Sequence, residues 1–266
     1  MNTAEPLDHR AAVAAESARF AGLVEGADLS LAVPTCPGWT LADLIRHTGG
    51  AQRMFTALVR ALVQERPASR GDVRLPERED GYADWLAAGA AEAERVFAGT
   101  DLDAPMWVWG ADGHARFWVR RMLFETLVHR FDAERALGLP SAIDPALARD
   151  GVDEFLVNLP FAAFFAPGVA ELRSAGPVQH IRFASTDTDD EWLVRLRPDG
   201  FGLVDGQDGP GHGGPGHGEM SADATVRAGA ADLLLLVYGR LDRSAAAVRS
   251  SGDEELLQRW FTHSAF

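Results

Sequence analysis

The chain has 266 residues with an apolar fraction of 47%, and because this length exceeds the roughly 100–200 residues of a single domain, we expect two domains. The formal net charge of −14 argues against a nucleic-acid or anionic-membrane surface, since both need clustered basic residues. The single cysteine, Cys36, excludes an internal disulfide, and the lack of both a signal peptide and an apolar run of about 18 residues predicts a cytoplasmic protein.

The first part of the chain predicts two helices joined by a loop. Apolar residues recur at helical spacing over 7–27, and a loop rich in proline and glycine follows over 33–39. Thr40 and Asp43 then resemble a capping box, in which a hydroxyl residue precedes an acid by three positions. The helix that begins there carries an apolar stripe, and His47 lies on that stripe, where we expect it to be buried.

Two further helices are expected over 80–98 and 115–137. The fourth helix ends at a Gly-Leu-Pro sequence and is apolar around most of its circumference, which predicts burial in a helical bundle. Along one line of this helix, however, the polar residues Glu125, His129 and Asp132 follow one another at steps of four and three. Residues at these steps share one face of a helix.

His47, Glu125 and His129 are candidate metal ligands. Polar groups that are buried cost several kcal/mol unless they find partners, and one divalent cation would satisfy all three. Two histidines and one carboxylate that leave a coordination position open are a common ligand set for catalytic zinc. A glutamate and a histidine four residues apart also occur by chance on many helices, and a core histidine is often only hydrogen-bonded. The residues alone leave both interpretations open.

The second part of the chain predicts an α+β domain. An apolar helical stretch over 144–165 is interrupted at Pro160. Alternating apolar and polar residues then predict an antiparallel meander, and two helices follow it. The expected strands cover 180–186, 191–198 and 200–204, with a fourth possible over 224–227, and the expected helices cover 229–240 and 253–262. A Gly-Pro-Gly-His repeat over 209–218 could bind metal, but its glycine content favours a mobile loop.

Three segments resemble one protein family. The run from Cys36 to His47 resembles the opening motif of the mycothiol-dependent maleylpyruvate isomerase family, and 121–132 resembles its second signature. The segment 224–240 resembles the C-terminal domain of that family. The resemblance implies a DinB-like four-helix bundle over 1–143 and a small sterol-carrier-like α+β domain with an antiparallel sheet over 144–266.

The same resemblance implies that His47, Glu125 and His129 hold a divalent metal, usually zinc, and that mycothiol is the thiol cosubstrate. In the isomerases a thiolate adds to an activated cis double bond, the bond rotates, and elimination returns the trans isomer; in related transferases the thiolate displaces a leaving group. Arg240 matches a family arginine and is our candidate to stabilise the developing negative charge. It could equally be an arginine favoured by a helix C-terminus.

Other residues near these motifs have open roles. Asp132 could accept a hydrogen bond beside the metal or act as a helper base, and a surface salt bridge is an equal alternative. Structural packing is favoured for Cys36 over a role as ligand or nucleophile. Trp39 is expected to pack at the start of a helix rather than contact the substrate.

The sequence favours a metal-dependent enzyme, either an isomerase or an S-transferase, that acts on a small electrophilic substrate with a low-molecular-weight thiol. Two alternatives use the same scaffold: a non-catalytic module that binds a metal and a ligand, and a hydrolase that uses zinc-bound water. The expected partners are small molecules, with neither nucleic acid nor membrane, and the resemblance favours a monomer. The substrate is not readable from the residues.

Overall fold

The computed structural model describes residues 7–68, 74–204 and 221–264, so the repeat at 209–218 lies outside the described residues. The chain divides into two compact units, Met1–Val108 with Asp112–Ala142, and Trp109–Ala111 with Ile143–Phe266. Trp109–Ala111 was expected in the first domain but belongs to the second. There the backbone N–H of Ala111 donates to Asn158 Oδ1 at 3.0 Å, a long-range contact that no local pattern encodes.

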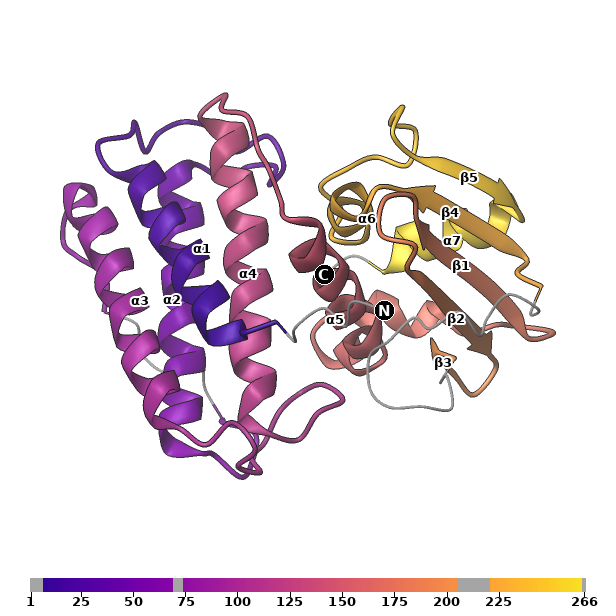
Figure 1. Ribbon diagram of the computed structural model, residues 1–266, viewed down its shortest axis with the longest axis horizontal. Coiled ribbons are helices and arrows are strands. Elements are labelled where there is room, and N and C mark those ends of the chain that lie inside the picture. The colour runs from indigo at the N-terminus through magenta and orange to yellow at the C-terminus, as the bar shows by residue number, and fades with distance from the viewer. Residues whose placement is uncertain (1–6, 69–73, 205–220, 265–266) are drawn as a thin grey trace. The chain divides into compact units, whose positions relative to one another are not determined.

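The first unit is a four-helix bundle. Its helices are α1 (His9–Val24), α2 (Leu41–Ala61), α3 (Tyr82–Gly99) and α4 (Ala115–Ala136). Helices α1 and α2 each pack against both α3 and α4, so the four helices surround a shared interior (Figure 1). All four lie where the sequence predicts them, which confirms the fold class for this half of the chain.

A tight turn and a capping box fix the start of α2. The backbone N–H of Trp39 donates to the carbonyl of Cys36 at 3.0 Å, and Gly38 between them has a φ of 84°, which favours glycine. The predicted capping box is present, because Thr40 Oγ1 accepts from the Asp43 N–H at 3.2 Å and Asp43 Oδ2 accepts from the Thr40 N–H at 2.9 Å. The turn and cap together hold Cys36 and Trp39 beside the first turn of α2.

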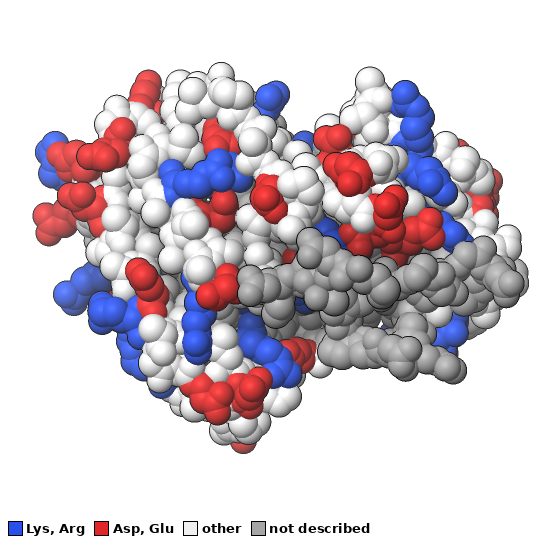
Figure 2. All heavy atoms as spheres, in the orientation of Figure 1, with Lys and Arg blue, Asp and Glu red and all other residues white. Residues whose placement is uncertain are grey.

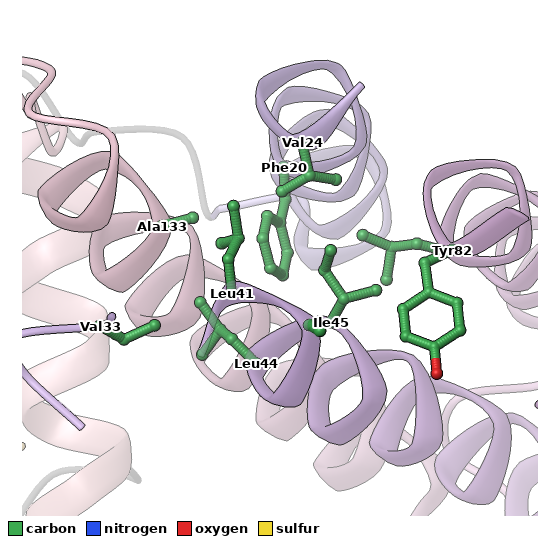
Figure 3. Close-up of a cluster of buried hydrophobic side chains, with 10 residues drawn as sticks. Phe20, Val24, Val33, Leu41, Leu44, Ile45, Tyr82 and Ala133 are labelled. Atoms are coloured by element: carbon green, nitrogen blue, oxygen red, sulfur yellow. The ribbon is translucent and has the colours of Figure 1, made fainter. Parts of the chain in front are cut away.

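A hydrophobic cluster anchors this loop to the bundle (Figure 3). Leu41, Leu44 and Ile45 of α2 are fully buried there, and Cys36 and Trp39 pack against the cluster while remaining partly exposed. The other labelled members come from α1, α3, α4 and the loop before α2: Phe20, Val24, Tyr82, Ala133 and Val33. Because Ala133 belongs to α4, this cluster brings the loop next to the C-terminal half of α4.

The buried face of α2 differs from the predicted stripe. Thr48 is fully buried, whereas the side chain of His47 is 40% exposed. Both positions follow Leu44 by about one helical turn, so periodicity alone permits either. Thr48 can be buried because its hydroxyl donates to the carbonyl of Leu44 at 3.0 Å and so keeps a partner away from water. The expectation that His47 is buried was therefore wrong, and His47 lies at the edge of the bundle.

A buried ion-pair network joins α1 to α4. The Arg130 side chain is fully buried, and its guanidinium pairs with Glu16 of α1 through Nε and with Glu134 through Nη1, the latter at 2.6 Å. Both glutamates are also buried. Breaking such a pair by removing one partner is costly because an uncompensated charge stays buried.

The second unit contains a five-stranded sheet and packed helices, which confirms the α+β class (Figure 1). The strand order is β3-β2-β1-β4-β5. The strands are β1 (Gln179–Ser185), β2 (Glu191–Arg197), β3 (Gly200–Leu203), β4 (Ala224–Ala228) and β5 (Arg249–Gly252), and the α-helices are α5 (Pro145–Asn158), α6 (Ala230–Val237) and α7 (Glu254–His263).

The sheet is mixed, which corrects the expectation of an antiparallel sheet. Strands β1, β2 and β3 form the predicted meander, but β4 pairs with β1 in parallel. Period-two alternation identifies strands without giving their direction. Strand β5 was not predicted, because its Arg-Ser-Ser-Gly sequence is exposed throughout and lacks alternation.

One face of this sheet packs on α7. Phe183 of β1 and Phe201 of β3 contact Trp260 of α7, with ring centroids 5.6 Å and 6.3 Å apart. These aromatic contacts tie the edge and centre of the sheet to the C-terminal helix.

The predicted interruption at Pro160 is also present, since α5 ends at Asn158 and the 3₁₀ segment η2 (Leu159–Phe164) follows.

Figure 2 shows acidic and basic side chains interspersed over the visible face, with no broad basic surface among its described residues. Of the helices in the described part of the chain, none combines the length and the apolar character needed to cross a membrane.

Candidate metal centre

The structure brings His47, Glu125 and His129 together between α2 and α4. Glu125 Oε1 lies 2.8 Å from Nε2 of His47 and 3.4 Å from Nε2 of His129. One donor atom from each of the three residues lies within 4.8 Å of the others. Two segments almost eighty positions apart in the sequence thus meet at one carboxylate oxygen. The arrangement follows from the packing of α2 on α4.

The donor set fits a divalent cation such as zinc. Imidazole nitrogen and carboxylate oxygen are ordinary zinc ligands, and both histidines direct the same ring nitrogen, Nε2, toward the shared centre. The other nitrogen of His129, Nδ1, lies 2.8 Å from Asp132 Oδ2. Metal-binding histidines almost always make such a bond with the nitrogen that faces away from the metal. The role of these residues as metal ligands remains a prediction.

The electrostatics of the centre favour a charged pair when no cation is bound. Burial alone would lower the pKa of His129, but hydrogen bonds with Asp132, Cys36 and Glu125 outweigh it and raise that pKa to about 10. Burial would raise the pKa of Glu125, yet hydrogen bonds with His129 and His47, together with nearby positive charge, hold it well below its usual value. A cation must therefore displace a proton from His129.

Asp132 is fully buried and accepts hydrogen bonds through both carboxylate oxygens. Its Oδ1 accepts from the Thr35 hydroxyl at 2.6 Å, and its Oδ2 accepts from His129 Nδ1 at 2.8 Å and from the Cys36 thiol at 3.4 Å. The alternative of a surface salt bridge was wrong, because the Asp132 side chain has no exposed area. These contacts place Asp132 to orient His129, and its proposed catalytic role remains a prediction.

Trp39 borders the centre from the loop before α2. Its ring centroid lies 5.0 Å from that of His47 and 6.3 Å from that of His129, and it is stacked on the latter. Sequence reasoning assigned Trp39 to packing at the helix start. The residue does pack there, and it also forms a wall beside both imidazoles.

Cys36 forms a second group of possible metal donors with His129 and Asp132. Hydrogen bonding explains this group without a cation, because the thiol donates to Asp132 and the imidazole Nδ1 uses the same carboxylate. The favoured role of Cys36 in packing agrees with its place against the hydrophobic cluster.

Arg121 is a site residue that sequence reasoning missed. It lies one turn before Glu125 on α4, and its Nη2 donates to Glu125 Oε2 at 3.3 Å. Its side chain is only 5% exposed. The available signal was an arginine four residues before a candidate ligand on one helix face, because residues at this spacing are neighbours.

Arg240 lies in the second unit, after the C-terminus of α6. Its Nη1 donates to the carbonyl of Tyr238 at 2.8 Å, and its N–H donates to the carbonyl of Leu235 at 2.7 Å. These contacts agree with the alternative of an arginine at a helix C-terminus. Its proposed catalytic role remains a prediction.

Comparisons with known proteins cover almost the whole chain. The family model of the mycothiol maleylpyruvate isomerase N-terminal domain matches residues 10–134, and that of the MDMPI C-terminal domain matches residues 146–259. Two similar solved structures are those of the mycothiol-dependent maleylpyruvate isomerase, with a TM-score of 0.57, and of a histidine-to-alanine mutant, with 0.58. Each is 14% identical, and each alignment covers 92% of this chain and 93% of the other. Among curated proteins, no sequence matches.

Proposed function

Because the chain belongs to the mycothiol maleylpyruvate isomerase family, we propose that it is a metal-dependent enzyme that uses a low-molecular-weight thiol, mycothiol, on a small electrophilic substrate. The reaction class is isomerisation or S-transfer. The observation that carries this proposal is the meeting of His47, Glu125 and His129, whose donor atoms lie within 4.8 Å of one another.

His47, Glu125 and His129 would hold the metal, which we take to be zinc. When bound, zinc would supply Lewis-acid chemistry that lowers the pKa of a thiol, so that a thiolate is available near neutral pH. Two histidines and one glutamate would leave a coordination position for that thiol.

The surrounding residues of the chain orient these ligands. Asp132 accepts a hydrogen bond from the Nδ1–H of His129 and so directs Nε2 toward Glu125. Thr35 holds the other oxygen of Asp132, which keeps the carboxylate from rotating. Trp39 covers one side of both imidazoles, and the partly exposed side chain of His47 would let solvent and ligands approach the centre.

Metal analysis of the purified protein tests the proposal. We expect about one zinc per chain in the wild type and loss of that zinc in His47→Ala. His263→Ala is the matched control, because His263 lies on α7 and belongs to neither group of metal donors. Calorimetric titration with mycothiol should then show binding to the wild type and to the control but not to His47→Ala.

Turnover assays separate this proposal from its alternatives. Activity on activated cis alkenes or on alkyl electrophiles that requires mycothiol supports the thiol-using enzyme. Equal turnover without the thiol would indicate a zinc-water hydrolase. Metal and thiol binding without turnover of any such electrophile would instead favour a non-catalytic binding module.

A further inference from the structure

Glu125 presents its two carboxylate oxygens to different partners. Oε1 faces the imidazole nitrogens, at 2.8 Å from His47 and 3.4 Å from His129. Oε2 instead accepts from Arg121 Nη2 at 3.3 Å. The oxygens of one carboxylate are equivalent in solution, so this division is imposed by the surroundings.

Arg121 is suited to impose that division. It lies four residues before Glu125 on α4, so the two side chains are neighbours on one helix face. Its side chain is 5% exposed and that of Glu125 is 20% exposed, so water competes little for their hydrogen bond. A guanidinium also has a rigid, planar arrangement of donors, which fixes direction better than an ammonium does.

We propose that Arg121 is a positioning residue that restricts Glu125 to one-oxygen binding of the metal and thereby keeps a coordination position open for the thiol. This inference rests on the proposed function. A carboxylate that binds through both oxygens would occupy the position that a fourth ligand needs. Catalytic zinc sites depend on that vacancy, whereas structural sites are closed.

The proposal makes an unusual expectation for Arg121→Met, which removes the donor but keeps an apolar side chain in a buried position. The metal should still bind about as tightly as in the wild type, because a second oxygen becomes available and a nearby positive charge disappears. Mycothiol should bind at least about tenfold more weakly. Mutation of residues that hydrogen-bond to metal ligands typically causes losses of this size in metal affinity or activity. A residue with only a structural role would instead weaken metal binding and stability.

The test loads metal-free wild type, Arg121→Met and Arg121→Gln with Co²⁺ and records stoichiometry, visible absorption and mycothiol affinity. A thiolate that binds Co²⁺ adds a thiolate-to-metal charge-transfer band, so growth of this band during a mycothiol titration reports whether a coordination position is open. We expect Arg121→Met to need about tenfold or more mycothiol for the same band, with partial recovery for Arg121→Gln, which retains an N–H donor. Arg135→Met is the matched control, since Arg135 is an exposed arginine on the same helix.

The outcomes distinguish a failure of the proposed function from a failure of the role proposed for Arg121. If the wild type binds no Co²⁺, the proposed function fails and the role of Arg121 fails with it. If the wild type binds Co²⁺ and mycothiol but Arg121→Met has the same spectrum and thiol affinity, only the role of Arg121 is refuted. Circular dichroism of each variant, compared with Arg135→Met, identifies a loss that is due to misfolding, and Arg121→Gln then decides the question.

Discussion

Gly49 and Gly50 are neighbours on α2 whose replacement by alanine should have opposite effects. Either substitution should stabilise the helix by about 0.5–1 kcal/mol, because glycine loses more backbone freedom on folding than alanine. Apart from its chain neighbours and the backbone of its own helix, no atom lies within 4 Å of a Cβ added at Gly50. A Cβ added at Gly49 would lie 2.7 Å and 2.9 Å from two ring carbons of Trp85 on α3, closer than packed carbons approach.

Trp85 cannot move aside without losing contacts. Its indole N–H donates to the carbonyl of Arg74 at 3.0 Å, and the guanidinium of Arg53 lies 3.8 Å from its ring centroid. Inserting a methyl group into such a packed contact typically costs about 1–3 kcal/mol. The helix-propensity gain is common to both variants and cancels in the comparison. Gly49→Ala should therefore be less stable than Gly50→Ala by about 1–3 kcal/mol.

Urea unfolding followed by circular dichroism measures this difference, with free energies from linear extrapolation. The same pair in a Trp85→Ala background is the control, because the obstacle to Gly49→Ala is then absent. There the two variants should agree within about 0.5 kcal/mol. Equal stability of the two variants with Trp85 present would refute the close approach of α3 to α2.

Three further predictions concern charged groups in the first unit. Zinc affinity should rise about tenfold per pH unit between about pH 7 and 9, because the raised pKa of His129 means that zinc displaces one proton from it. Competition titration with a chelator measures the affinity at each pH, and an affinity that does not change with pH would contradict this prediction. Asp132→Asn should lower the pKa of His129 in the metal-free protein, because it removes the charged acceptor at Nδ1. NMR titration measures this pKa. Asp84→Asn, at an exposed position on α3, is the control and should leave the pKa of His129 unchanged. Arg130→Ala should destabilise the protein by about 3–5 kcal/mol in urea unfolding, because it removes the buried cation that Glu16 and Glu134 share and leaves them with the half-exposed Arg19. The exposed Arg135→Ala should change stability by no more than about 1 kcal/mol.

The residues alone located the bundle helices and the three candidate ligands. Helical periodicity and punctuation are local properties, so α1 to α4 could be placed from the sequence. Glu125 and His129 share a face because they are four residues apart on one helix. His47 entered this group because it lies on the apolar stripe of its own helix, although nothing local to α2 identifies which residue on α4 it meets.

Long-range packing decided the remaining features. Thr48 rather than His47 is buried on α2, which leaves one of the three candidate ligands partly exposed. Asp132 gains Thr35 as a partner across almost a hundred positions, and Arg121 takes one oxygen of Glu125. In the second unit, β4 pairs with β1 in parallel although its alternation matches either direction.

The sequence by itself therefore determined where the α-helices and the strands other than β5 lie and which residue types could bind a metal. The tertiary structure decided which of those side chains are buried, which atoms they face and how the strands pair. The physical reason is that periodicity depends on neighbours a few residues away, whereas the position and orientation of a side chain depend on whichever distant segment packs against it.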